Sequence, residues 1–161
     1  DLAWNAARRL QLSNAESGWI QTMVRWHMKL LPLVNAKAPL TRKAIYRFFQ
    51  ETGDAGVAIA LHSLADTAAT FGDSLSHNKW ETAVEVTRSL LAAWWEQQES
   101  LISPKLLLDG NDLQEEFNIK PGKQIGSLLK SLKEAQAVGD VSGLEEAKAY
   151  VRSQLDQTEK G

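Results

Sequence analysis

The stretch at residues 13–31, SNAESGWIQTMVRWHMKLL, indicates the class of fold. Ser13 and Glu16 have the spacing of a capping box, in which each side chain satisfies a free backbone N–H at the start of a helix. Side chains at helical spacing follow, and together they form one mainly apolar face: Ile20, Met23, Val24, His27, Leu30 and Leu31. We therefore expect an amphipathic helix that Pro32 ends or kinks.

Comparable start and stop signals divide the rest of the chain into helices. Residues 2–10 have the pattern of the end of a helix, and residues 57–71 are apolar nearly all round, so we expect that helix to be central. The expected helices begin at Thr41, at Asp54, at Asn78 with Glu81, near Asn111, at Lys123, and at Ser142 with Glu145. The helix from Asn78 should reach about Leu101.

No stretch alternates apolar and polar residues over the length of a strand, so the sequence predicts an all-α protein without a sheet. Ser103-Pro104 breaks the helical pattern, and we place a boundary there. The prediction is a helical body of about five helices in residues 1–102, followed by a small helical tail in residues 103–161.

Composition limits the classes of function. The 161 residues are 43% apolar and carry a net charge of −2, so a core can form and no overall field attracts nucleic acid. The absence of cysteine excludes disulfides and cysteine zinc sites, and it favours a cytoplasmic protein. No apolar run reaches the roughly 18 residues of a membrane span. Because the chain begins inside an apolar pattern, we expect it to be a piece of a longer protein.

A first group of cations lies in a stretch without acids. Residues 17–50 contain no Asp or Glu, and the cations there are Arg25, Lys29, Lys37, Arg42, Lys43 and Arg47. Like charges four residues apart on a helix cost about 0.2–0.5 kcal/mol per pair, a cost that a bound phosphate backbone would offset. Arg42, Lys43 and Arg47 are therefore candidates for binding RNA phosphates, although a solvated basic face explains the pattern equally well.

A second group surrounds the sequence KPGK at residues 120–123. The helix expected to begin there presents free N–H groups with positive partial charge, which can bind an anion. Lys123 and Lys130 are seven residues apart and share a face, so Lys120, Gly122, Lys123 and Lys130 become phosphate-binding candidates. Taken alone, a simple Pro-Gly turn would be the better explanation.

Three motifs in this region resemble a known family. They are PKLLLDGNDL at residues 104–113, IKPGKQIG at 119–126 and EAQ at 134–136. They are similar to the C-terminal region of the bacterial tRNA nucleotidyltransferase/poly(A) polymerase family. Upstream, RRLQLSN at 8–14, VRWH at 24–27 and SLAD at 63–66 resemble the second half of the HD-type domain found in these enzymes.

The resemblance implies that catalysis and RNA binding lie in different regions of a longer enzyme. The family's nucleotidyltransferase core carries a Gly-Gly turn and paired metal-binding aspartates, and nothing in this sequence resembles it. That core, with Mg²⁺, would add nucleotides to an RNA 3′ end, while the present region would hold the RNA, a tRNA. Its partners would be the RNA and its own N-terminal catalytic domain, with no membrane. We therefore expect no catalytic residue and no cofactor here.

The HD resemblance supplies only two weak candidates for metal ligands, His27 and Asp66. The His-Asp pair of such sites has no counterpart, and one imidazole with one carboxylate would leave a divalent ion under-coordinated. We expect no metal, a packed His27 and a hydrogen-bonded Asp66. Two alternatives stay open: a fragment of an HD-type metal-dependent phosphohydrolase, and a helical module that binds another protein.

Overall fold

A computed structural model describes residues 2–36 and 39–159, and every regular element in that part of the chain is helical. The predicted all-α class is therefore confirmed. The chain divides into two compact units, an N-terminal unit, Asp1–Glu96, and a C-terminal unit, Gln97–Gly161. The sequence placed a boundary at Ser103-Pro104, slightly further along the chain.

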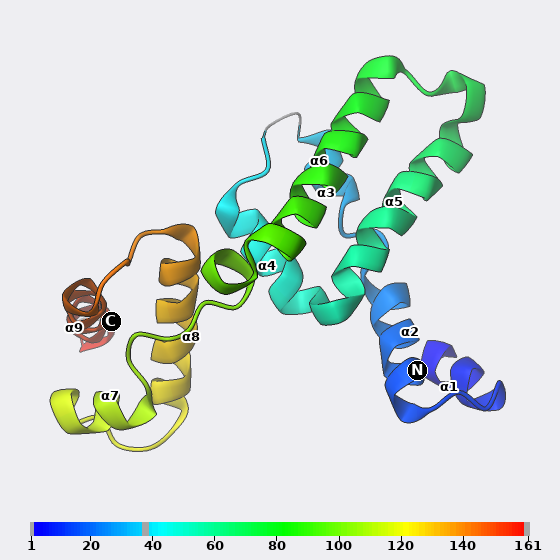
Figure 1. The fold of residues 1–161 in the computed structure, drawn as a ribbon. Coiled ribbons are helices and arrows are strands. Elements are labelled where there is room, and N and C mark those ends of the chain that lie inside the picture. Colours follow the sequence, from blue (N-terminus) through cyan, green and yellow to red (C-terminus); the bar gives the residue numbers. More distant parts are fainter. Residues whose placement is uncertain (1, 37–38, 160–161) are drawn as a thin grey trace. The chain divides into compact units, whose positions relative to one another are not determined.

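The described residues of the N-terminal unit form six α-helices and two short 3₁₀ turns (Figure 1). They are α1 (Leu2–Arg9), α2 (Asn14–Trp26), α3 (Leu31–Asn35), α4 (Arg42–Thr52), η1 (Gly53–Ala55), α5 (Gly56–Phe71), η2 (Gly72–Ser74) and α6 (His77–Glu96). The capping box at the start of α2 is present, since the Glu16 carboxylate accepts from Ser13 N at 2.8 Å and Glu16 N donates to Ser13 Oγ at 3.2 Å. Pro32 lies in the first turn of α3.

The core of this unit forms where α4 meets α5 and α6. Phe48 and Phe49 of α4 are buried, and the Phe49 ring lies 5.0 Å from the Trp94 ring, centroid to centroid. A Cβ on Gly56 would lie 2.6 Å from Thr52 Oγ1, so only glycine permits this close approach between the start of α5 and α4. α5 and α6 lie side by side as an antiparallel pair joined through η2 (Figure 1).

Burial in α2 and α5 is lower than the sequence predicted. Val24 is 54% exposed and His27 is exposed, so the prediction that these side chains face inward is wrong. Leu61 of α5 is 49% exposed, so α5 is not buried on all sides, although it contacts α2, α4 and α6. Apolar periodicity identifies the face of a helix that prefers burial, but it does not supply the partner that would cover it.

The C-terminal unit has a separate core. Its elements are η3, a π-helical turn (Gln98–Ile102), α7 (Gly110–Phe117), α8 (Lys123–Val138) and α9 (Leu144–Glu159). The buried side chains of the core include Leu108, Leu113, Leu132 and Val151. The expected helix through Leu101 stops at Glu96 because Gln97 leaves helical geometry, with φ −128° and ψ 29°.

Two predicted helix caps are wrong by one or two residues. At α9 the Glu146 carboxylate, rather than Glu145, accepts from Ser142 N at 2.7 Å, because the helix begins at Leu144. At α6 the cap comes from Ser76, whose Oγ accepts from Lys79 N at 3.4 Å, instead of from Asn78.

No helix in the described part of the chain is long and apolar enough to cross a membrane.

Candidate RNA-binding surfaces

The first candidate surface lies on α4 and consists of Arg42, Lys43 and Arg47, which we call the α4 basic surface. All three residues are exposed, whereas Ile45 and Phe48 on the same helix are buried. The apolar side of α4 therefore anchors the helix and leaves the cations on its solvent side. Each of the three also interacts with other groups of the protein, so none is an isolated charge.

The charge at the start of α4 is unusual for a helix. Arg42 and Lys43 occupy the first turn, which contains no acid. The first turn of a helix carries positive partial charge, so cations there are unfavourable and an anion is favourable. Thr41 Oγ1 accepts from Ala44 N at 3.2 Å and satisfies one of the free donors. This helix start would gain stability from a bound phosphate.

Lys29, in the turn that follows α2, does not extend the α4 basic surface. Lys29 forms an ion pair with Glu51 of α4, and its Nζ lies 4.6 Å from the centre of the Trp26 ring. Its side chain is only 26% exposed. Glu51 lies one position beyond the acid-free stretch, so the acid that pairs with Lys29 comes directly after it. Lys37 lies outside the described residues.

The second candidate surface surrounds the start of α8, and we call it the α8 basic surface: Lys120, Gly122, Lys123 and Lys130. All four residues are exposed. Gly122 is the N-cap of α8 and provides no side-chain hydrogen bond to the first turn. Lys123 and Lys130 lie on one exposed side of the helix, so positive side chains and the helix start are presented together.

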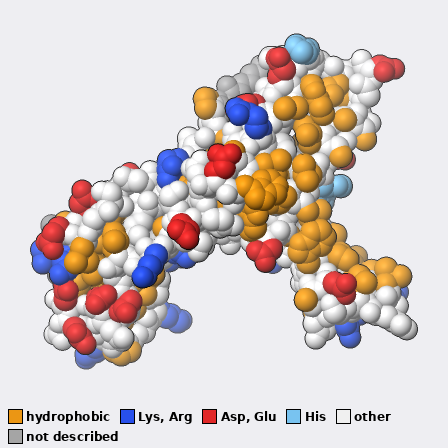
Figure 2. Space-filling view, viewed as in Figure 1, with side chains coloured by type: hydrophobic (Ala, Val, Ile, Leu, Met, Phe, Trp, Pro, Cys, Tyr) orange, Lys and Arg blue, Asp and Glu red, His pale blue; other side chains and the backbone are white. Residues whose placement is uncertain are grey.

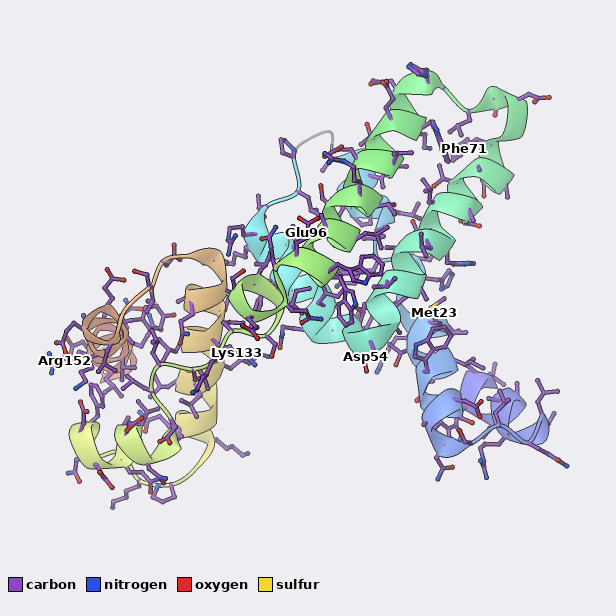
Figure 3. The ribbon with its side chains drawn as sticks, viewed as in Figure 1. Met23, Asp54, Phe71, Glu96, Lys133 and Arg152 are labelled. Carbon is purple, nitrogen blue, oxygen red and sulfur yellow. The ribbon has the colours of Figure 1, made fainter. Side chains whose placement is uncertain are left out.

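Lys133 behaves differently from the other lysines of α8. It is half-buried, and its Nζ donates to Ser103 Oγ at 3.3 Å, beside η3 (Figure 3). Lys133 therefore contributes to packing within the C-terminal unit. Of the three lysines of α8, Lys123 and Lys130 are exposed and Lys133 is half-buried.

The motif GNDL at residues 110–113, which the sequence predicted only as a helix start, forms the first turn of a capped helix, α7. Asp109 is the N-cap of α7, and its carboxylate accepts from Asn111 N at 2.7 Å and from Asp112 N at 3.0 Å. The Asp112 carboxylate accepts from Asp109 N at 2.7 Å, which completes a capping box. The backbone donors of Asp112 and Asn111 hold the pKa of Asp109 below its ordinary value.

Gln136 of the EAQ motif also has a role that sequence reasoning missed. Its Nε2 donates to the Lys105 carbonyl at 2.8 Å, and its Oε1 accepts from Leu107 N at 3.2 Å. The side-chain amide thus fastens the segment before α7 to α8. The partners are about thirty residues apart in sequence, which no local pattern reveals.

The two weak metal candidates lie on different elements, His27 at the C-cap of α2 and Asp66 within α5, and both are exposed. His27 Nδ1 is 2.7 Å from the Val24 carbonyl oxygen, and the His27 ring centre is 6.3 Å from that of His62. Within residues 2–36 and 39–159, no three side chains from His, Asp and Glu are grouped to hold a metal ion. The described residues therefore offer no ready coordination sphere.

Comparison with known proteins gives a consistent set of relatives. The chain is 29% identical over 158 residues to the A-adding tRNA nucleotidyltransferase of Deinococcus radiodurans, covering 98% of this chain and 34% of that protein. It is 31% identical over 129 residues to the CC-adding enzyme of Thermus thermophilus, covering 80% of this chain and 26% of that protein. It is 28% identical over 151 residues to the CC-adding enzyme of Synechocystis sp., covering 94% and 33%. No protein-family model matches the chain, and no solved structure is significantly similar.

Proposed function

Because this chain is related to the CC- and A-adding tRNA nucleotidyltransferases, as its motifs predicted, we propose that it is the RNA-holding C-terminal helical region of such an enzyme. The chain spans about a quarter to a third of the length of these relatives. Nucleotide addition and its Mg²⁺ would belong to a catalytic core that this sequence does not contain. The match across 98% of the chain to one tRNA enzyme is the observation that carries the proposal.

The two basic surfaces supply the chemistry for holding RNA. A-form RNA has a deep, narrow major groove that side chains read poorly, so shape and phosphate contacts dominate its recognition. The α4 and α8 basic surfaces each combine exposed cations with a helix start, which together suit a phosphate oxygen. Binding of this kind positions a tRNA without reading its bases.

The salt dependence of tRNA binding tests this proposal. Each lost phosphate contact on RNA lowers the slope of log affinity against log salt by about 0.7 to 0.9. We would compare the parent with Arg42→Ala/Lys43→Ala/Arg47→Ala and with Lys123→Ala/Lys130→Ala. Arg9→Ala/Arg152→Ala is a matched control, because it removes two exposed cations that lie outside both surfaces.

The slopes of the four proteins distinguish RNA binding from a basic surface that is only solvated. We expect both surface variants to lower the slope and the control to leave it unchanged. Equal slopes in all four proteins would show that the surfaces are merely solvated, and a change in one surface variant would assign the contact to that surface. An absence of binding even at low salt would contradict the RNA proposal and favour a helical module that binds another protein.

A further inference from the structure

Exposed large hydrophobic side chains are concentrated in the N-terminal unit. Leu144 is the one example in the described part of the C-terminal unit, whereas the N-terminal unit exposes Leu2, Leu10, Trp19, Val24, Met28, Leu61, Val84 and Trp95. Hydrophobic side chains gather over α5 and α6 on the face that Figure 2 shows. Contiguous exposed apolar surface of this kind marks an interaction site.

Three of these side chains line one groove between α5 and α6. Leu61, Val84 and Trp95 border a groove of about 460 Å³, together with Leu64 and Leu91. Trp95 is 65% exposed. Because α5 is apolar on nearly all sides, its outer face would normally be covered by another helix. The groove is therefore a docking face that the described part of this chain leaves open.

The charges along α6 indicate what fits this face. Arg88, Ala92 and Glu96 are spaced four residues apart, so they form one stripe on the helix, and all three line the groove. The Arg88 side chain is 71% exposed, and Glu96 is exposed at the end of α6 (Figure 3). The stripe carries a cation at one end, an anion at the other, and a small residue between them.

Such a stripe is complementary to itself in the antiparallel direction. If α6 packs against α6 of a second copy about a twofold axis near Ala92, Arg88 faces Glu96 of the partner copy, and the same pair forms again across the axis. The small Ala92 side chains would let the helices approach closely. Glu85 already orients the Arg88 guanidinium, through hydrogen bonds of 3.0 Å to Nε and 2.8 Å to Nη2.

We propose that the groove between α5 and α6 is a self-association surface, on which two copies of this chain pack with their α6 helices antiparallel. Leu61 and Trp95 would be buried in the interface, and the two Arg88–Glu96 pairs would set the register. The interaction does not involve either basic surface, so it is independent of the RNA proposal.

Sedimentation equilibrium over a wide concentration range tests the apolar part of the surface. The parent should approach twice the mass of the 161-residue chain. Leu61→Glu/Trp95→Glu should be monomeric, while Leu144→Glu/Leu2→Glu, which places two charges at exposed apolar positions outside the groove, should still dimerise. A parent that stays monomeric at high concentration would overturn the proposal and leave the groove to another occupant. Dimers that persist in Leu61→Glu/Trp95→Glu would also overturn it.

Charge reversal tests the register. Arg88→Glu alone and Glu96→Arg alone each place like charges together across the axis and should raise the dimer dissociation constant about tenfold or more. The double variant Arg88→Glu/Glu96→Arg restores both pairs in the opposite sense and should recover most of the parent affinity. Far-UV circular dichroism confirms that each variant keeps its helices. A double variant that is no tighter than the single variants would refute the antiparallel arrangement.

Discussion

Replacement of Gln136 by alanine should destabilise the C-terminal unit by about 2 kcal/mol. A hydrogen bond contributes about 0.5–1.5 kcal/mol net, and a buried group left without a partner costs about 1–3 kcal/mol. Gln136 makes two such bonds, to the half-buried Leu107 N and to the exposed Lys105 carbonyl. Water can replace the bond at Lys105, so most of the loss comes from the Leu107 N–H.

The distribution of tryptophans makes this effect measurable in one unit. All six tryptophans precede Gln97, so their fluorescence reports on the N-terminal unit, whereas far-UV circular dichroism reports on both. In urea, Gln136→Ala should shift part of the dichroism transition to lower concentration and leave the fluorescence transition in place. Amide exchange at Leu107 should accelerate.

Gln124→Ala is the matched control. Gln124 is exposed on the same helix, and among the described residues its side chain forms no hydrogen bond to another element. It should behave like the parent by every probe. If Gln136→Ala were as stable as Gln124→Ala, the amide would contribute nothing to holding the segment at residues 105–107, and the reasoning would be refuted.

Three further predictions concern activity, metal and pH. Incubated with tRNA, nucleotide triphosphates and Mg²⁺, or with phosphodiesters and a transition metal, the chain should show no turnover; turnover abolished by Asp66→Ala would support the phosphohydrolase reading instead. Elemental analysis after dialysis should find no stoichiometric metal, and a full equivalent would contradict the expectation. The pKa of Asp109 lies below its ordinary value of 3.8, so its cap stabilises the fold fully above that value and loses this contribution as pH falls through the lowered pKa. Acid should therefore destabilise the parent more than Asp109→Asn, and identical acid unfolding curves would argue against the cap.

Local features of the fold could be predicted from the sequence. The capping box of Ser13 and Glu16 needs only residues within one turn, and the structure contains it. The α9 cap shows the limit of that approach, because Glu145 and Glu146 are adjacent acids and only the position of the first helical residue selects between them. A shift of one residue changes which carboxylate reaches back to the backbone.

Features that depend on distant partners could not be predicted. The Lys29–Glu51 ion pair joins the turn after α2 to α4, and the hydrogen bonds of Gln136 join α8 to the segment before α7. Exposure on α5 follows from which helices are present to cover it. Periodicity describes one helix at a time, so it contains no information about these contacts.

The motifs that carry the family resemblance contain residues with two different roles, since Lys120, Gly122 and Lys123 of IKPGKQIG also belong to the α8 basic surface. Asp109 and Gln136 build the C-terminal unit through hydrogen bonds to backbone groups, whereas Lys123 and Lys130 are exposed and make no contact that stabilises its core. Loss of the Gln136 amide or of the Asp109 cap should therefore lower the stability of the C-terminal unit. The variant Lys123→Ala/Lys130→Ala should unfold like the parent and change only the salt slope of tRNA binding. If that variant lost stability as well, a weaker slope could arise from unfolding, and the lysines could no longer be assigned to phosphate contacts.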